Sequence, residues 1–236
     1  MSSVKGLLLD AVGRFALRDA KVVAVREVGP VMRAIELTGE KLRAVDWVPG
    51  DKIQILLPSK DVRTYTPTRW DSRAGTTEIL AYHHGTSPGS AWSRATAVGD
   101  TVRFVGPQRS LRRASSSKHA ILFGDETSFG VACALAGVDA TTLHGVLEVT
   151  SRGEAEPVVT ACGAHVDLVE RRAADAHLDE VTQRLVALLA AHPGAELLMT
   201  GRAQSIQAVR ARLRDSGVRP RDQSKPYWSV GKAGLD

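Results

Sequence analysis

The chain has 236 residues, of which 43% are hydrophobic and 24% charged, and this is the composition of a soluble globular protein with room for two small domains. Its net charge of +5 is mild and spread along the sequence, which argues against a nucleic-acid-binding protein. There are two cysteines, Cys133 and Cys162, and no cysteine or histidine cluster at metal-ligand spacing, so we expect no iron–sulfur or structural zinc site.

No segment has the pattern of a secretion signal or a membrane span. The apolar run Gly6-Leu7-Leu8-Leu9 is interrupted by Asp10, and no later run is long enough to cross a bilayer. We therefore expect a cytoplasmic protein without membrane contacts. Cys133 lies in an apolar stretch with the pattern of a helix, so we expect it to be a small core residue.

Residues 1–113 are predicted to form one domain, whose part from residue 21 onward has the pattern of a small antiparallel β-barrel of six strands. Short apolar runs alternate with Gly, Pro and Asp, as in strands joined by tight turns. The runs lie at residues 22–28, 35–37, 53–57, 79–82 and 102–105.

Within this domain, the segment Arg63-Thr64-Tyr65-Thr66-Pro67 has the composition of a strand. Alternation places Arg63 and Tyr65 on one face, roughly 7 Å apart, and Pro67 favours an extended Thr66. Arg63 could clamp a phosphate, Tyr65 could lie against a flavin ring, and Thr66 could bond the polar edge of that ring. The alternative is a plain strand with an exposed arginine and a half-buried tyrosine.

A second segment, residues 84–92, is rich in Gly and Ser and precedes a predicted helix. Gly89 allows close backbone approach, and Ser90 can cap the helix, whose N-terminus would attract phosphate. Taken alone the segment is typical of a turn, but its order after the first segment favours a flavin-nucleotide site. The residues predicted to line this site are Arg63, Thr64, Tyr65, Thr66, Tyr82, His83, His84, Gly85, Gly89, Ser90, Ala91 and Trp92.

The two histidines of this set, His83 and His84, are interpreted as walls of the site or polar core. We do not assign them acid–base roles, because a flavin would carry the chemistry itself.

A local cluster of cations lies between Arg109 and Lys118, and it includes the polar run Ser115-Ser116-Ser117. We interpret residues 110–118 as a linker. The cluster is either a solvated loop or an electropositive rim for an anionic substrate. The candidate rim cations are Arg109, Arg112, Arg113, Lys118 and Lys232.

Residues 119–236 have the pattern of a parallel α/β domain. Apolar runs at 120–123, 143–149, 166–169 and 197–199 alternate with helical patterns such as Leu178, Val181, Leu185 and Leu188. Strands that alternate with helices indicate a parallel sheet with right-handed crossovers.

At the carboxyl ends of these strands, where ligands bind in such sheets, lie Gly124-Asp125-Glu126-Thr127, Arg152 and Arg202. The acidic pair would repel a pyrophosphate and also suits simple helix capping. We expect Gly124 and Thr127 to approach a nicotinamide or flavin ring, and we count Asp125 among the cofactor-binding residues of the same segment. Arg152 and Arg202 would hold a 2′-phosphate, which favours NADPH over NADH.

Several short motifs, in order, resemble the siderophore-interacting proteins, a family within the ferredoxin-reductase-like group. The resemblance covers nearly the whole chain. It rests on Pro49-Gly50-Asp51, Arg63 to Thr66, His84 to Trp92, Val98-Gly99-Asp100, the short turn Gly106-Pro107, Gly124 to Thr127, and Tyr227-Trp228. The departures are Ser128-Phe129-Gly130, Gly201-Arg202 and Pro226, and all of them lie in the second half.

This resemblance implies an FAD-binding β-barrel followed by a smaller domain, residues 119–236, for NADPH or NADH. The implied reaction takes two electrons as hydride into FAD and passes them singly to ferric iron in a siderophore, which is thereby released inside the cell. It also implies that the C-terminal tail lies near the flavin, so that Trp228 could cover the ring, although such a pair most often pins a terminus.

Three alternatives remain from the residues. The protein could be a general flavin or ferredoxin-type reductase with a ferredoxin-like partner. It could be a non-catalytic flavin-binding redox module that has lost nucleotide binding, as the altered second-half motifs suggest. A nucleic-acid-binding protein rests on charge alone and would bind DNA in a salt-dependent way.

Overall fold

The structure is a computed structural model that describes residues 17–113, 118–138 and 142–231. The chain divides into two compact units, Met1–Arg112 and Arg113–Asp236, which we describe separately. The predicted linker serines, Ser115 to Ser117, and the candidate rim cation Lys232 lie outside the described residues.

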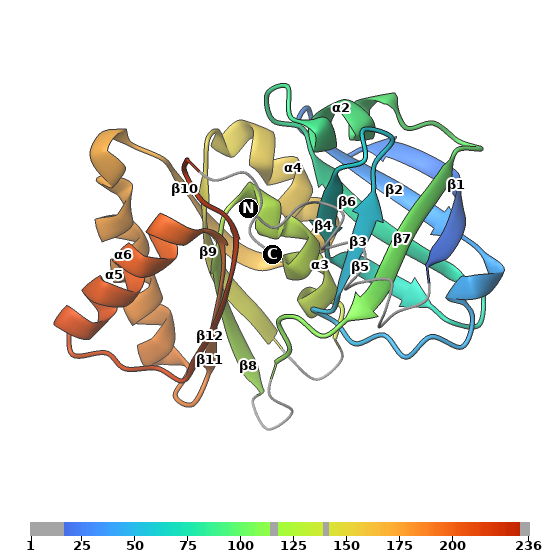
Figure 1. Cartoon of the computed structure of the whole chain (residues 1–236). Helices are drawn as coiled ribbons and strands as arrows, with labels where there is room; N and C mark the ends of the chain where they lie inside the picture. Colours follow the sequence, from blue (N-terminus) through green and yellow to red (C-terminus); the bar gives the residue numbers. More distant parts are fainter. Residues whose placement is uncertain (1–16, 114–117, 139–141, 232–236) are drawn as a thin grey trace. The chain divides into compact units, whose positions relative to one another are not determined.

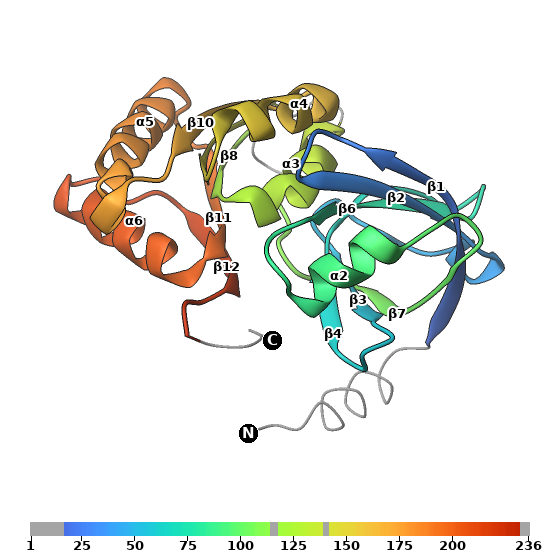
Figure 2. The ribbon, with the colours of Figure 1, turned by 90° about the horizontal axis from the view of Figure 1, so that it is seen from above.

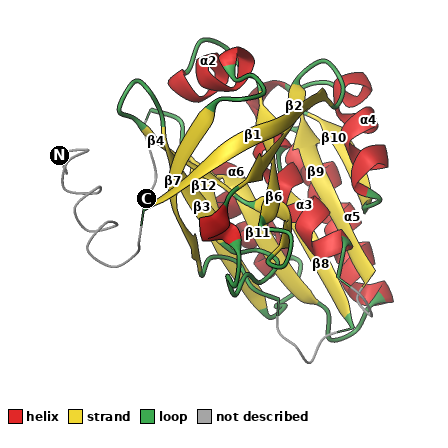
Figure 3. Cartoon of the chain, turned by 90° about the vertical axis from the view of Figure 1, so that its right-hand side faces the viewer, coloured by secondary structure: helices red, strands yellow, loops and turns green. Residues whose placement is uncertain are grey.

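The first unit is built from an antiparallel sheet of seven strands and the helix α2 (Pro88–Ala95), drawn in red in Figure 3. The strands are labelled in Figure 1: β1 (Arg18–Glu27), β2 (Met32–Thr38), β3 (Lys52–Leu56), β4 (Val62–Tyr65), β5 (Pro67–Asp71), β6 (Thr76–Tyr82) and β7 (Thr101–Gln108). A short 3₁₀ helix (Glu40–Leu42) follows β2.

This sheet curls round on itself. Its strand order is β4-β3-β7-β1-β2-β6-β5, so β4 and β5 stand at opposite ends. Yet a single residue, Thr66, separates them along the chain. The two ends of the sheet must therefore meet at that residue, which closes the barrel. The predicted antiparallel barrel is confirmed, with seven strands rather than six because the chain bends at Thr66-Pro67 and splits one strand into two.

The barrel core follows from side-chain alternation. Its buried residues come from every long strand and from the 3₁₀ turn, and they include Val22, Ile35, Leu42, Ile53, Ile55, Ile79 and Phe104. Gly106-Pro107, predicted as a short turn, lies inside β7 instead. The register between β3 and β7 shifts there, and such an irregularity accommodates a proline that has no N–H to donate.

The second unit is a five-stranded, wholly parallel sheet, as the sequence pattern predicts. Its strands are β8 (His119–Gly124), β9 (Thr142–Val149), β10 (His165–Glu170), β11 (Glu196–Arg202) and β12 (Asp222–Trp228). Its helices are α3 (Phe129–Ala136), α4 (Arg152–Cys162), α5 (His177–Ala191) and α6 (Ala203–Asp215), with 3₁₀ turns at Glu126–Ser128 and Ala173–Asp175.

The strand order β10-β9-β8-β11-β12 reverses direction after β10. Right-handed crossovers then place α3 and α4 on one face of the sheet and α5 and α6 on the other (Figures 1 and 2). The reversal makes the carboxyl ends of β8 and β11 the topological switch point, where open α/β sheets bind ligands. Gly124 ends β8 and Arg202 ends β11, so these two predicted nucleotide residues lie at this point, whereas Arg152 follows the neighbouring strand β9.

The strand β12 differs from expectation, because Tyr227-Trp228 was predicted to lie in a tail. Residues Asp222–Trp228 pair in parallel with β11 as the edge strand. Their polar sequence and Pro226 do not resemble a buried strand, but an edge strand tolerates proline and polar residues. Backbone pairing with β11, rather than local propensity, makes this segment a strand.

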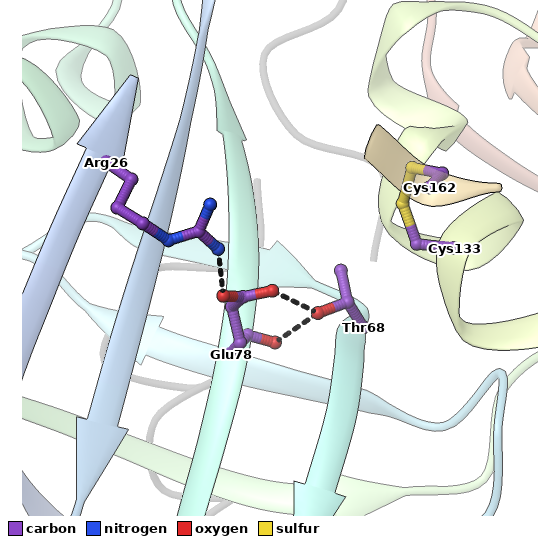
Figure 4. The surroundings of a disulfide bond; sticks show 5 residues. All are labelled: Arg26, Thr68, Glu78, Cys133 and Cys162. Atoms are coloured by element: carbon purple, nitrogen blue, oxygen red, sulfur yellow. Dashed lines mark hydrogen bonds and ion pairs between the residues drawn. A yellow bond between two sulfur atoms is a disulfide. The ribbon is translucent and has the colours of Figure 1, made fainter. Parts of the chain in front are cut away.

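The two cysteines form a disulfide between α3 and the end of α4 (Figure 4). The prediction that Cys133 is a small core residue is wrong, since it is half-buried and bonded to Cys162. The two helices cover the same face of the sheet, and that packing brings together residues 29 positions apart. Among the described helices, none combines the length and apolarity needed to span a bilayer.

Candidate functional site

The two predicted halves of the flavin site meet in the first unit. Gly89 lies in the first turn of α2, and a Cβ on it would come 3.5 Å from Cγ of Arg63 and 3.6 Å from the hydroxyl of Tyr65. Arg63 and Tyr65 both lie on β4, spaced two residues apart. The motif strand and the helix start are therefore adjacent, with glycine at the point where they approach each other.

Tyr65 presents a neutral phenol at this point. Its ring packs against Trp92 of α2, with ring centroids 5.7 Å apart. Burial raises the pKa of the Tyr65 hydroxyl above its ordinary value of 10.0, against the opposing effect of the Arg63 charge. The tyrosine can therefore offer an aromatic face and a hydroxyl donor at any physiological pH.

Arg63 keeps much of its guanidinium open to a ligand. It donates to the carbonyl of Val62 (2.8 Å) and lies 3.9 Å from a carboxylate oxygen of Asp61, and its side chain is 37% exposed. A half-exposed arginine on a rigid strand suits a forked contact with phosphate.

The start of α2 is organised by Ser87 rather than by Ser90. Ser87 is the N-cap and accepts from the amide of Ser90, and Pro88 takes the first helical position. The prediction that Ser90 caps the helix is wrong, because Pro88 fixes the helix start and the N-cap is Ser87, three residues earlier. The Ser90 hydroxyl instead donates to the carbonyl of His84 (2.7 Å) and accepts from its amide (3.0 Å), which holds the preceding loop against the helix.

The other predicted flavin residues surround this junction. Thr64 is exposed on β4 and Thr66 sits at the bend. Tyr82 stacks on His84, with centroids 5.1 Å apart. Gly85 and Ala91 are exposed, whereas His83 Nδ1 lies 3.1 Å from the hydroxyl of Ser93. Burial lowers the pKa of His83 below 6.5, as expected for a neutral wall residue.

The bend after the motif is braced by Glu78 of β6. This carboxylate is buried, accepts from Thr68 Oγ1 (3.1 Å) and pairs with Arg26 (Figure 4). It also pairs with Arg69. Thr68 follows Pro67 directly, so these contacts fix the chain just beyond Thr66 and hold the motif strand in place.

A cavity of about 500 Å³ opens beside α2. Its walls come from α2, the loop before β4 and the start of β7, and they include Leu57, Pro58, Trp92, Ala95 and Val102. Trp92 thus contacts Tyr65 and also lines this cavity. An apolar cavity next to a helix N-terminus has the character of a site for the flat apolar part of a dinucleotide.

These features fit FAD. The donor set is an open arginine, the backbone at a helix start and a neutral tyrosine, and Gly89 leaves the space between them free of a side chain. Cations and helix N-termini are the groups that bind pyrophosphate.

In the second unit, the Gly124-Asp125-Glu126-Thr127 segment turns its carboxylates inward. Asp125 is fully buried and caps the 3₁₀ turn, accepting from the amide and hydroxyl of Thr127. A Cβ on Gly124 would lie 2.3 Å from Oγ of Ser128, which is why only glycine fits. Burial raises the pKa of Asp125 above its ordinary value. Thr127 is half-buried, and it is the least enclosed of the three predicted residues.

Three buried carboxylates, Asp125, Glu126 and Glu148, gather around Arg171, which sequence reasoning missed. Arg171 lies 2.8 Å from Glu126, 3.8 Å from Glu148 and 4.0 Å from Asp125. Glu148 also contacts Nε2 of His177 at 2.7 Å. The available signal was Glu148, a charged residue within the apolar run of β9.

The two predicted 2′-phosphate arginines differ in their surroundings. Arg152 begins α4 and its side chain is 55% exposed. Arg202 is only 12% exposed, and it donates to Asp175 (2.6 Å) and to Ser205 (2.6 Å). The charge of Arg202 is therefore already matched inside the unit, whereas Arg152 remains accessible.

Trp228 is bound to the same segment. Its Nε1 donates to Oδ2 of Asp125 at 2.7 Å, while the side chain is 36% exposed. The indole thus joins the edge strand β12 to the switch point, and one part of it stays accessible.

Of the predicted rim cations, Arg112 is engaged internally. It forms a two-pronged pair with the buried Asp51, with both contacts at 2.7 Å. Arg109 and Lys118 are exposed and Arg113 is half-buried. Arg112 is therefore not available to the expected rim of cations, because its charge balances that of the buried Asp51 in the turn before β3.

Acid should destabilise the protein through Glu126. Burial raises its pKa, but the Arg171 guanidinium outweighs burial and holds the pKa of Glu126 below 4.5. Its contribution is thus fully present above about pH 4.5 and is lost as pH falls through the lowered value. Urea unfolding across this range should show Glu126→Gln less stable than wild type at neutral pH and less sensitive to acid. Glu156→Gln, at a site 63% exposed, should behave like wild type.

Comparison with known proteins places these features in a family. Residues 59–111 match the model of the siderophore-interacting FAD-binding domain, and residues 117–231 match that of the siderophore-interacting protein. None of the curated proteins matches the chain significantly in sequence.

Solved structures share the fold. A siderophore utilization protein from T. fusca is 22% identical, with a TM-score of 0.75 over 94% of this chain and 96% of that one. The siderophore-interacting protein SipS from Aeromonas hydrophila is 23% identical, with a TM-score of 0.68 over 92% and 93%. A ferredoxin-NADP+ reductase from Plasmodium falciparum is 12% identical, with a TM-score of 0.68 over 89% and 95%.

The two models match segments on either side of the boundary between the units, and the first contains the motif strand and α2. The fold is the two-domain arrangement of ferredoxin-reductase-like proteins. The chain belongs to the siderophore-interacting protein family, and its barrel carries that family's FAD-binding domain.

Proposed function

We propose that the protein is an FAD-dependent reductase of ferric siderophores that draws its electrons from NADPH or NADH. The observation that carries this proposal is the meeting of Arg63 and Tyr65 with the start of α2 at Gly89. That junction combines a cation, a neutral aromatic hydroxyl and a helix N-terminus, which together suit a flavin dinucleotide.

Each residue at the junction has a binding task. Arg63 clamps the pyrophosphate with the free part of its guanidinium, and the first turn of α2 directs backbone amides at the same group. Tyr65 packs its ring against the cofactor and donates its hydroxyl. Ser90 keeps the loop at His84 in place through its two hydrogen bonds, so that His84 and Tyr82 wall the site.

When bound, FAD supplies the redox chemistry, since it takes up two electrons together and gives them out one at a time. The protein's own residues need no acid–base group for this step. The substrate is ferric iron in a chelate of hard oxygen ligands, and reduction to the ferrous state weakens that chelate and releases iron inside the cell.

For the electron donor, the accessible Arg152 is the favoured contact for a phosphate of the dinucleotide. For Arg202 to contact a second phosphate oxygen, its guanidinium must exchange the hydrogen bond to Asp175 for one to the ligand. A ferredoxin-like protein is the alternative donor. The exposed Arg109 and Lys118 are proposed as contacts for an anionic siderophore.

The test is the visible spectrum of the purified protein, recorded anaerobically before and after NADPH, then after a ferric hydroxamate or catecholate chelate. We expect a flavin spectrum that bleaches with NADPH and returns with the chelate, while a ferrous-specific dye develops colour. If reduced ferredoxin bleaches the flavin but NADPH and NADH do not, the electron donor is a protein and not a nicotinamide dinucleotide. No bleaching by any donor would leave a flavin-binding module and overturn the reductase.

Gly89→Ala should separate binding from folding. The added methyl would meet Arg63 and Tyr65 at 3.5–3.7 Å, an ordinary contact distance, and alanine favours a helix by up to about 1 kcal/mol over glycine. We expect unchanged or higher thermal stability of the FAD-free protein, but weaker FAD binding in fluorescence titration, because the methyl occupies space beside the clamp. Gly153→Ala, at the same second position of α4 and with nothing within 4 Å of the added methyl, is the matched control and should bind FAD as wild type does.

A further inference from the structure

Three histidines meet in the second unit, away from the switch point. His119 is the first residue of β8, His144 lies near the start of β9, and His192 ends α5 just before β11. All three lie at the amino end of the sheet, whereas the predicted nucleotide residues lie at its carboxyl end. The cluster therefore belongs to a different edge of the fold.

The backbone register explains why these side chains converge. His144 pairs with Ile121, so His119, two residues earlier, points to the same face of the sheet. That face is covered by α5, whose Leu185 packs in one core cluster with Ile121. The chain leaves α5 at His192, whose amide donates to Leu188, and its ring closes this end of the core.

The geometry is that of a ligand set. One ring nitrogen from each histidine lies within 4.8 Å of those of the other two. The ring of His192 stacks on both others, with centroids 4.5 Å from His119 and 4.0 Å from His144. Zinc–nitrogen bonds of about 2.0–2.1 Å require nitrogens roughly 3.3 Å apart in a tetrahedral site. Metal binding therefore requires the three half-buried rings to rotate so that their nitrogens close to that spacing.

A second observation points to a ligand. Nε2 of His144 is buried and has no hydrogen-bond partner among the described residues, which is costly for a polar atom unless something else binds it. A neutral imidazole presents the lone pair that a metal needs.

We infer that His119, His144 and His192 form a binding site for one divalent transition-metal ion of the zinc class. Three imidazoles with water in the fourth position are a known coordination for Zn²⁺. Imidazole ligands equally suit copper and nickel, and the absence of a carboxylate in the set disfavours magnesium and calcium. The ion would tie the amino ends of β8 and β9 to the end of α5.

The signal was invisible in the sequence because the three histidines are separated by whole secondary-structure elements. Short-range metal motifs place ligands a few residues apart in the sequence. Here the three histidines come from β8, β9 and the end of α5, so they meet only after these elements have packed together. The expectation of no metal ligands was therefore drawn from spacing alone.

The test uses the full-length protein without a histidine tag, treated with EDTA and dialysed. Zn²⁺ is titrated against a chromophoric chelator, and Co²⁺ is added as a spectroscopic probe. We expect one Zn²⁺ per chain, a tetrahedral Co²⁺ visible spectrum, and a higher melting temperature with metal. His144→Gln and His192→Gln should each lower Zn²⁺ affinity by more than the roughly 10–100-fold that loss of an outer partner costs.

His165→Gln is the matched control. His165 is exposed and pairs with His144 across β10 and β9, so it shares the neighbourhood without belonging to the set, and its replacement should leave the affinity unchanged. If His144→Gln fails to fold by circular dichroism, His192→Gln decides, because its backbone rather than its ring caps α5. Failure of the wild type to bind Zn²⁺, equal affinity in all variants, or an equal loss in His165→Gln would overturn the site.

Discussion

Replacing Arg63 by glutamine should weaken FAD binding by about 10–100-fold, the equivalent of losing one charge-assisted hydrogen bond of about 1.5–3 kcal/mol. The reason is that Arg63 is the accessible cation beside Gly89 at the start of α2. Its existing contacts are one local hydrogen bond to the Val62 carbonyl and a 3.9 Å approach to Asp61 at a partly exposed site, so the fold should lose little. Quenching of flavin fluorescence on titration of the FAD-free protein measures the affinity.

Arg103→Gln provides the control for this variant. Arg103 is 54% exposed on β7 and pairs with Asp19, so its loss removes one surface charge of the same kind from the same barrel. It should bind FAD with wild-type affinity, and its free energy of unfolding should lie within about 1 kcal/mol of the wild-type value. Equal FAD affinity in Arg63→Gln and wild type would show that β4 is a strand with an exposed arginine and no binding role.

Replacing Arg171 by glutamine should destabilise the second unit by about 3–5 kcal/mol, the cost of leaving a buried charge without its partner. Arg171 faces three carboxylates, of which Asp125 and Glu148 are fully buried and Glu126 nearly so. Glutamine can keep a hydrogen bond to Thr150 or Glu126, but it has no positive charge to balance the three carboxylates. Urea unfolding, monitored by circular dichroism, measures the change.

The neighbouring Arg172 is the control for that experiment. It is 58% exposed and pairs with Glu180 on α5, so Arg172→Gln should cost no more than about 1 kcal/mol. The double variant Arg171→Gln with Glu126→Gln should recover part of the lost stability, because it removes one of the uncompensated charges. If Arg171→Gln and Arg172→Gln have similar stability, the carboxylates are protonated or solvated and Arg171 is not their counter-ion.

The sequence by itself determined the two halves of the fold and the order of the binding motifs. Alternating apolar runs specify the barrel strands, and short buried runs between helical patterns specify the parallel sheet, because burial of one face imposes its period on the chain. Arg63, Tyr65 and Gly89 could be predicted as one site because strand alternation and helix-start chemistry are local properties. For the same reason Asp125 was recognised as a possible cap.

Only the tertiary structure decided which charges and side chains are matched. Arg112 and Arg202 look like free cations in the sequence, but folding brings them to Asp51 and Asp175. The carboxylates that surround Arg171 come from the 3₁₀ turn after β8 and from β9. The edge strand β12, the disulfide and the three-histidine cluster likewise depend on segments that meet only after the sheet has formed. The physical reason is common to all of them: local propensity and periodicity act over a few residues, whereas pairing, counter-charges and ligand sets depend on contacts between distant segments.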